Sequence, residues 1–171
     1  QLNATEFLGY EYNKAEGVIL KILKNNDFTE EAKVGDEVEL ITNQTPFYGE
    51  SGGQVGDQGI IRTNKSKITI RDTLKKMGDL HVHIGKIDSG SIKVGETVNL
   101  EINIEKRNNA RAYHSATHLL HEALRRTLGK HVTQKGSLVS SEKLRFDFSH
   151  NKPIESSEIS KIEKFVNDII I

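Results

Sequence analysis

Residues 16–104 carry six short runs rich in β-branched and other apolar residues, separated by turn residues: GVILKIL, DEVELIT, QGIIRT, SKITIRD, DLHVHIGKI and ETVNLEINI. Several of them alternate, as Val38 and Leu40 do with Glu37 and Glu39. The last run places apolar residues at every second position: Val98, Leu100, Ile102 and Ile104. A period of two is typical of strands that bury one face. Its repetition, with glycines between the runs, predicts a small antiparallel β-barrel or sandwich without helices.

The pattern becomes helical at about Lys106. Asn108 and Asn109 are suited to cap a helix, and Gly129 stands where a left-handed residue would end it. The apolar residues between them have helical spacing: Tyr113, Ala116, Leu119, Leu120, Ala123, Leu124 and Leu128. We therefore expect the strongest helix of the chain here. The change of pattern also predicts two domains, residues 1–104 and residues 105–171.

Shorter signals follow this helix. Two or three strands are indicated by HVTQKG, SLVS and LRFDFSH, and the alternation in the last one turns three residues inward: Leu144, Phe146 and Phe148. A second helix is expected from about Ser157, where apolar residues recur at helical spacing: Ile159, Ile162, Phe165, Val166 and Ile169. Together these elements predict an α+β fold, a barrel followed by an incomplete α+β core. The sequence stops at DIII without a capping residue, so we expect a fragment cut within a helix.

The composition is that of an ordinary globular protein, because 35% of the residues are hydrophobic and 28% are charged. There is no cysteine, which excludes disulfides, thiolate zinc sites and a cysteine nucleophile within this chain. No run approaches the roughly 18 apolar residues of a membrane span, and the first residues lack the pattern of a signal peptide. We expect a soluble, cytoplasmic protein without a membrane partner.

The charges balance overall but not locally. Lysine plus arginine and aspartate plus glutamate each number 24, so the net charge says nothing about an anionic partner. Residues 106–131 contain one acid, Glu122, and six basic residues: Lys106, Arg107, Arg111, Arg125, Arg126 and Lys130. Such an excess predicts either a surface that contacts phosphates or a solvated helix face.

Three of the seven histidines lie within eight residues, in HSATHLLH. At about 100° per residue, His114, His118 and His121 project within roughly 60° of one another, opposite the apolar face. Two histidines at i and i+4 can point at one ion, so His114 and His118 form half of a metal site. The alternative is a solvated or hydrogen-bonded surface stripe. A zincin-type peptidase needs glutamate after the first histidine, where this chain has Ser115.

A second unusual stretch, TPFYGESGGQVGDQG at residues 45–59, has five glycines in fifteen residues. Glycines allow positive φ and close backbone approach, and clustered amides can meet an anion. The stretch is not a phosphate-binding P-loop, because GxxxxGK[ST] is absent and no helix follows. On spacing alone, a turn-rich connection within the barrel is favoured.

Five motifs stand in one order along the chain: TPFYGESGGQVGD (45–57), HIGKIDSGSIKV (83–94), HSATHLLH (114–121), GKHVTQKGSLV (129–139) and LRFDFSH (144–150). Together they resemble an internal segment of the alanyl-tRNA synthetases, with the β-barrel domain and the first part of the editing domain. The resemblance runs from about Thr45 to the end and continues more weakly upstream. The freestanding AlaX editing proteins share two of the motifs, but QKGSLV followed by LRFDFSH favours the synthetase.

The resemblance implies a domain that hydrolyses the ester of tRNA(Ala) wrongly charged with serine or glycine. His114 and His118 match the first two zinc ligands, and a Cys-xxx-His pair further downstream would supply the others. Thr117 and Gln134 match residues that line the pocket for the aminoacyl group, and the threonine is implicated in recognising serine. The glycine-rich motif, residues 49–56, is expected near the editing site.

The sequence ends before any Cys-xxx-His pair, whereas catalytic zinc usually has three protein ligands. We therefore expect the isolated chain to be inactive and to hold zinc weakly or not at all, unless one of four side chains helps: His121, His131, His150 or Asp147. The class II catalytic core would lie upstream, so no ATP-dependent chemistry is expected from these residues. The partners implied are tRNA(Ala), through its acceptor phosphates, and the rest of the synthetase chain.

Two other interpretations remain at this stage. In one, the chain is a non-catalytic tRNA-binding or spacer module in which the histidines are incidental. In the other, it is an unrelated metal-binding protein. Zinc content and ester hydrolysis of a chain extended through the next Cys-xxx-His pair distinguish these interpretations from the editing hydrolase.

Overall fold

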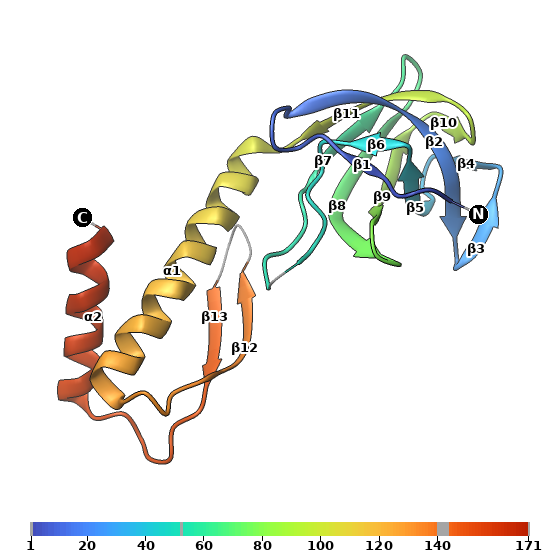
Figure 1. The fold of residues 1–171 in the computed structure, drawn as a ribbon. Helices are drawn as coiled ribbons and strands as arrows, with labels where there is room; N and C mark the ends of the chain where they lie inside the picture. The colour runs from blue at the N-terminus through green and yellow to red at the C-terminus, as the bar shows by residue number, and fades with distance from the viewer. Residues whose placement is uncertain (1, 52, 140–143, 171) are drawn as a thin grey trace. The chain divides into compact units, whose positions relative to one another are not determined.

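The computed structural model describes residues 2–51, 53–139 and 144–170. The chain forms two compact units, Gln1–Arg107 and Asn108–Ile171. The first unit is built from strands and the second from a hairpin and helices (Figure 1). The predicted α+β class is confirmed. Within the described residues, no helix is both long and apolar enough to cross a membrane.

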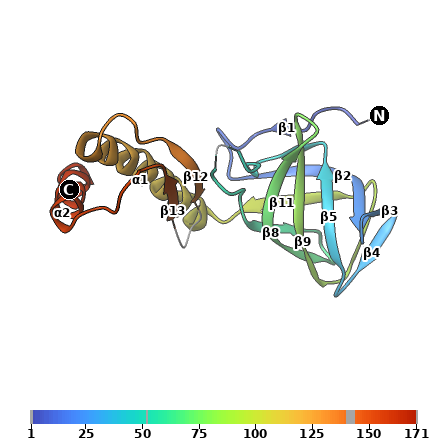
Figure 2. The same ribbon diagram turned by 90° about the horizontal axis from the view of Figure 1, so that it is seen from below.

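A closed antiparallel β-barrel forms the first unit (Figure 1, Figure 2). Its six strands are β2 (Lys14–Lys24), β5 (Glu37–Thr42), β7 (Gly59–Arg62), β8 (Lys67–Lys76), β9 (Leu80–Ser89) and β11 (Thr97–Ile102). The order is β11-β7-β8-β9-β5-β2, and pairing of β11 with β2 closes the sheet. Each of the six runs singled out in the sequence overlaps one of these strands, so the prediction of a barrel or sandwich is resolved in favour of the barrel.

Short strands that the sequence analysis did not predict decorate the barrel. They are β1 (Glu6–Phe7), β3 (Asp27–Thr29), β4 (Glu31–Lys33), β6 (Gln44–Thr45) and β10 (Ser91–Lys93). β1 pairs in parallel with β6, β4 pairs with β10, and β3 extends the sheet beyond β2. Runs of two or three residues are too short to show a period, which is why they escape pattern analysis.

The barrel interior holds one hydrophobic cluster, filled by the inward residues of the alternating strands. In β11, Val98, Leu100 and Ile102 are buried while their neighbours are exposed. The sequence analysis predicted that Ile104 continues this alternation. It does not, because it is the first residue of the following helix and is 46% exposed. The other buried members are Ile19, Ile22, Ala32, Val38, Leu40, Phe47, Ile61, Ile68, Ile70, Ile87 and Ile92.

The imidazole of His83 is fully buried in the barrel unit. Its Nδ1 lies 2.8 Å from the carbonyl oxygen of Leu40, which can only accept, so Nδ1 carries the proton. The bare Nε2 accepts from the hydroxyl of Thr45 at 2.8 Å. Burial lowers the pKa of His83 to about 4, although the Leu40 hydrogen bond opposes this. The ring is therefore neutral, with both nitrogens satisfied.

The glycine-rich stretch packs directly on strand β8. A Cβ on Gly56 would lie 1.9 Å from the carbonyl oxygen of Thr73, so only glycine fits there. Thr73 in turn donates its hydroxyl to the carbonyl oxygen of Asp57 at 2.9 Å. These contacts support the interpretation of the stretch as a connection within the barrel, with glycine used for close approach.

A buried ion pair fixes the end of this stretch. Arg107 donates its Nε to both carboxylate oxygens of Asp57, at 3.1 and 2.9 Å, and also contacts it through Nη2. Nη1 and Nη2 also donate to the carbonyl oxygens of Gly9 at 3.1 Å and Pro46 at 2.7 Å. Asp57 also accepts from the Tyr48 amide at 2.8 Å. Both charges are about 95% buried, and each of their nitrogen and oxygen atoms has at least one hydrogen-bond partner.

The long helix α1 spans Ile104–Leu128. Asn103 caps it, since its Oδ1 accepts from the Lys106 amide at 3.0 Å. The predicted caps at Asn108 and Asn109 are wrong, because the helix begins four residues earlier, directly after β11. Its predicted end is confirmed by Gly129, whose φ of 125° is unfavourable for other residues.

The second unit packs α1 with a hairpin and a second helix. The hairpin pairs β12 (Gln134–Val139) with β13 (Leu144–Phe148), and α2 spans Ser156–Ile170. Buried Ala123 and Leu124 of α1 cluster with Val132 and with Ile162 of α2. Phe146 and Phe148 pack on this cluster as predicted, whereas the side chain of Leu144 lies outside the described residues. On α2, Ile159 and Ile169 are 43% and 51% exposed, unlike Ile162.

The ion pair generates a prediction about the stability of the barrel. Replacing Arg107 with methionine leaves Asp57 buried and uncompensated, which should lower the free energy of unfolding by about 3–5 kcal/mol. The double variant Asp57→Asn with Arg107→Met should lose much less than the sum of the single changes. Urea denaturation followed by far-ultraviolet circular dichroism measures both. The exposed pair of Arg71 and Glu37 supplies the control, because Arg71→Met should cost under about 1 kcal/mol. Equal losses for the two arginines would contradict this account.

The buried histidine generates a pH dependence. Because the pKa of His83 is about 4 in the folded chain and about 6.5 when unfolded, only the unfolded state gains this proton between those values. The free energy of unfolding should therefore fall, by roughly 3 kcal/mol in total, as the pH decreases from about 6.5 towards 4. Denaturation curves at pH 7 and 4.5 test this against His83→Gln, in which this contribution is absent. The stability difference between the two proteins should shrink at the lower pH; a constant difference would refute the assignment.

Candidate functional site

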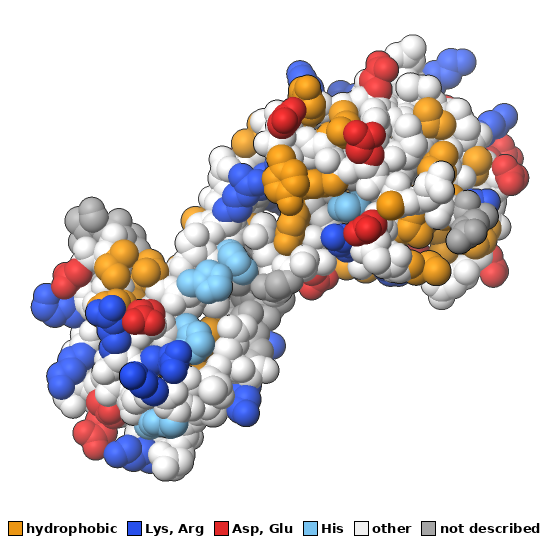
Figure 3. Space-filling model, in the orientation of Figure 1, with side chains coloured by type: hydrophobic (Ala, Val, Ile, Leu, Met, Phe, Trp, Pro, Cys, Tyr) orange, Lys and Arg blue, Asp and Glu red, His pale blue; other side chains and the backbone are white. Residues whose placement is uncertain are grey.

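Two histidines meet on one face of α1. His114 and His118 stand one turn apart, and their Nε2 atoms approach to 3.2 Å. The ring centroids are 4.8 Å apart and the rings are perpendicular. Histidine side chains are visible at the surface of the second unit in Figure 3. The interpretation that places both imidazoles on one side of the helix agrees with this geometry.

The separation of the two nitrogens suits a shared metal ion. Two nitrogens bound at about 2.0–2.1 Å to one tetrahedral zinc ion lie roughly 3.3 Å apart. Without a metal, the same contact is a hydrogen bond, in which one Nε2 carries a proton and the other accepts it. Binding a cation needs both Nε2 atoms bare, so the donating ring must carry its proton on Nδ1 instead, as the accepting ring already does. The Nδ1 of His114 is buried and has no hydrogen-bond partner within the part of the chain that the structure describes.

The other side chains considered as ligands lie in different contacts. His121 packs on Phe146, with centroids 5.5 Å apart, and Asp147 pairs with Arg145 at 3.4 Å. His131 and His150 form a second pair, in which Nε2 and Nδ1 are 2.9 Å apart. Among residues 2–51, 53–139 and 144–170, no three or more metal-binding side chains gather at one point. The described residues therefore offer two ligands at His114 and His118 and no third.

Thr117 precedes His118 and faces inward. Its side chain is 5% exposed, and its hydroxyl donates to the carbonyl oxygen of Tyr113 at 2.9 Å. The hydroxyl oxygen keeps acceptor capacity after this bond. Gln134, the other residue predicted for the pocket, is exposed on a different element, at the start of β12 opposite Phe148.

The basic segment is less available than its sequence suggests. The prediction that Arg107 belongs to a solvated or phosphate-contacting face is wrong, because its guanidinium is buried against Asp57. Arg126 pairs with Glu122 at 2.8 Å, a hydrogen bond that lowers the pKa of that carboxyl, and also lies over Phe165. Arg111 and Lys130 are exposed. These two retain the strongest claim to phosphate contacts.

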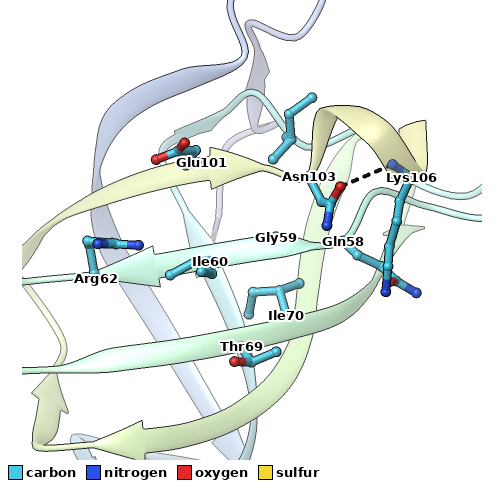
Figure 4. Close-up of a pocket in the computed structure, with 10 residues that line it drawn as sticks. Gln58, Gly59, Ile60, Arg62, Thr69, Ile70, Glu101, Asn103 and Lys106 are labelled. Carbon is cyan, nitrogen blue, oxygen red and sulfur yellow. Dashed lines mark hydrogen bonds between the residues drawn. The ribbon is translucent and has the colours of Figure 1, made fainter. Parts of the chain in front are cut away.

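Two pockets of the barrel contain none of His114, Thr117, His118 and Gln134, although one of them includes Gly49 and Ser51 of the glycine-rich stretch. One, with a volume of about 350 Å³, crosses β11, β7 and β8 and is lined by Gln58, Ile60, Arg62, Thr69, Glu101 and Lys106 (Figure 4). At its edge, Lys106 donates to the side chain of Gln58 at 2.7 Å. The other, of about 410 Å³, has aromatic walls. Sequence reasoning missed both because their residues come from segments far apart in the chain.

The first unit matches a family of known proteins. Residues 1–106 match the family described as tRNA synthetases class II (A), and the chain belongs to this family.

Curated relatives identify the branch of the family to which the chain is similar. They are alanine-tRNA ligases, 53% identical over 171 residues in Mesorhizobium japonicum, 50% over 171 in Rhodopseudomonas palustris and 54% over 168 in Rhizobium meliloti. These alignments cover 98–100% of this chain and 19% of each relative. The chain therefore spans about one fifth of the length of these relatives. The alignments cover both of its units.

Proposed function

We propose that this chain is the segment of an alanyl-tRNA synthetase that begins the editing site, where serine or glycine wrongly esterified to tRNA(Ala) is hydrolysed. The approach of the two imidazole nitrogens to 3.2 Å is the observation that supports this most directly. The family and the alanine-tRNA ligase relatives support the tRNA partner. The relatives are named for a ligase activity. We assign that activity, and any binding of ATP, to other parts of a longer chain.

His114 and His118 would hold a zinc ion through Nε2, with further ligands from residues beyond this chain. A bound zinc ion supplies Lewis acidity, which lowers the pKa of a coordinated water or orients the ester. The helix contributes rigidity, since both rings project from one face, one turn apart. Their mutual contact in the absence of metal preforms the separation that two ligands of one ion need.

Thr117 would recognise the hydroxyl of serine. Its own hydrogen is already donated to the Tyr113 carbonyl, so towards a substrate the oxygen would act as an acceptor. Serine can donate its hydroxyl to this oxygen and alanine cannot. A site built for that hydrogen bond rejects the analogue that lacks the hydroxyl. Gln134, the remaining residue proposed for the pocket, would contact the aminoacyl group from β12.

A chain extended through the next Cys-xxx-His pair tests the ligands. It should hold about one zinc ion and hydrolyse Ser-tRNA(Ala). His118→Ala should remove the zinc and lower the hydrolysis rate by more than about 100-fold, since even changes outside the direct ligands cost 10–100-fold. Metal analysis and release of labelled serine measure the two effects.

His121→Ala is the matched control, because this histidine lies on the same helix and packs on Phe146 instead. It should keep both zinc and activity. Zinc retained after both His114 and His118 are changed to alanine would show that the ligands lie elsewhere. An extended chain that holds zinc but leaves Ser-tRNA(Ala) intact would favour the non-catalytic spacer.

Discrimination by Thr117 can be tested separately. In the same extended chain, Thr117→Val removes the acceptor and should lower kcat/KM for Ser-tRNA(Ala) by roughly 5- to 100-fold, the effect of losing one buried hydrogen bond. Thr117→Ser keeps the hydroxyl and should retain most of the activity. Gly-tRNA(Ala) has no side-chain hydroxyl, so its hydrolysis should change much less. Equal losses for both substrates would indicate a structural role.

A further inference from the structure

An aromatic pocket opens on the surface of the barrel unit, away from His114, Thr117 and His118, and includes Gly49 and Ser51 of the glycine-rich stretch. Its volume is about 410 Å³, and six of its lining residues carry the argument: Phe7, Tyr10, Tyr48, Lys75, Asp79 and His81. Hydrophobic side chains gather beside a histidine on this face of the barrel (Figure 3). Phe7 is at its centre, 5.0 Å from Tyr10 and 6.4 Å from Tyr48, with both contacts edge-on. Phe7 also stacks on His81, with centroids 5.4 Å apart and rings within 2° of parallel.

Tyr10 exposes its aromatic ring to solvent, on a turn whose backbone is held by hydrogen bonds. It is 88% exposed, more than Tyr12, at 54%, on the same turn. The turn is held at three points: the Leu8 amide donates to Thr45 at 2.8 Å, the Tyr12 amide to Leu8 at 3.0 Å, and Arg107 to the Gly9 carbonyl at 3.1 Å. At this exposure, the Tyr10 ring is not part of the hydrophobic core. Its open faces are free to stack on a ligand.

His81 adds an unsatisfied polar group to the pocket. Its side chain is 6% exposed, and its Nδ1 is buried without a hydrogen-bond partner among the described residues. Such atoms are costly unless something binds them. Burial lowers the pKa of His81, although a hydrogen bond from the ring to the Asp79 backbone carbonyl opposes this, so the ring is neutral and Nδ1 can donate or accept according to its tautomer.

The charges at the pocket cancel. Lys75 and Asp79 pair at 3.4 Å, so the site offers no excess positive charge to a phosphate or an acidic peptide. A suitable ligand is flat, aromatic and uncharged, and carries hydrogen-bonding groups at its edge. A nucleobase has all of these properties, because every base has a π-face and an edge of donors and acceptors.

We infer that the pocket formed by Phe7, Tyr10, Tyr48 and His81 binds one unpaired base of RNA, stacked on Tyr10 and hydrogen-bonded to Nδ1 of His81. The identity of the RNA rests on the proposed function, which places a tRNA with a single-stranded 3′ end at this protein. The base is held by stacking and edge contacts, whereas the phosphates are left to cations elsewhere. The barrel thereby becomes an RNA-binding unit as well as a support.

Fluorescence titration of the 171-residue chain tests this. The probe is a four-nucleotide single-stranded RNA whose 3′ base is 2-aminopurine, and stacking on tyrosine should quench it. Tyr10→Ala should weaken binding by roughly 5- to 100-fold, the usual cost of losing one base-aromatic stack. Tyr10→Phe keeps the ring and should bind within about twofold of the unchanged chain.

Matched controls come from two other exposed aromatics of the barrel. Tyr12→Ala and Phe28→Ala remove rings that are 54% and 66% exposed and do not line the pocket, so each should bind within about twofold. No quenching, or equal weakening by Tyr12→Ala, would overturn the inference. So would self-association of the chain that is lost in Tyr10→Ala, since the pocket would then serve a second copy.

The titration and the test of the proposed function can succeed or fail independently of each other. The titration needs neither zinc nor hydrolysis, so quenching that depends on Tyr10 supports the pocket even if an extended chain fails to cleave Ser-tRNA(Ala). Conversely, an extended chain that carries Tyr10→Ala could cleave Ser-tRNA(Ala) with an unchanged KM while the probe stays unquenched. That result would refute base binding in the pocket and would leave the editing proposal intact.

Discussion

The buried contact between Arg107 and Asp57 ties together parts of the first unit that the chain keeps far apart. The guanidinium joins the first turn of α1 to the end of the glycine-rich stretch, to Pro46 and to the turn at Gly9. Each guanidinium nitrogen and each carboxylate oxygen in the contact has a hydrogen-bond partner, which is the condition under which a buried charge pair is tolerated. The turn that presents Tyr10 and the start of the helix that carries the histidines both depend on it.

The histidine pair illustrates how one helix can preform part of a site. The spacing of four residues brings His114 and His118 into contact without help from any other element. A third ligand requires a segment from elsewhere, and none of the described histidines or acids takes that place. Thr117 completes the local arrangement, because its bond to Tyr113 leaves an acceptor beside the pair. In the proposed function, this helix would therefore supply two ligands of an ion and one substrate contact.

The two proposals assign different tasks to the two units. In the second unit, imidazoles and a threonine address the ester and the amino acid that it carries. In the first unit, aromatic rings address a base through stacking and through one orphaned nitrogen. In the barrel pocket Lys75 and Asp79 pair, so the proposed specificity rests on directional bonds and ring faces. Exposed side chains such as Arg111 and Lys130 would be left to contact phosphates.

The sequence by itself determined the features that depend on neighbours along the chain. Six short apolar runs, several of them alternating, predicted the barrel strands; helical spacing predicted both helices, and the i, i+4 spacing predicted the histidine pair. Helix α1 nevertheless begins at Ile104 instead of after Asn108, since the cap used depends on where β11 ends. The tertiary structure alone decided that Arg107 is buried, because its partner lies 50 residues away. The tertiary structure likewise brought Phe7, Tyr48 and His81 together in the aromatic pocket. No local sequence pattern predicts that these residues are close, because closing a barrel joins segments that have no periodic relation in sequence.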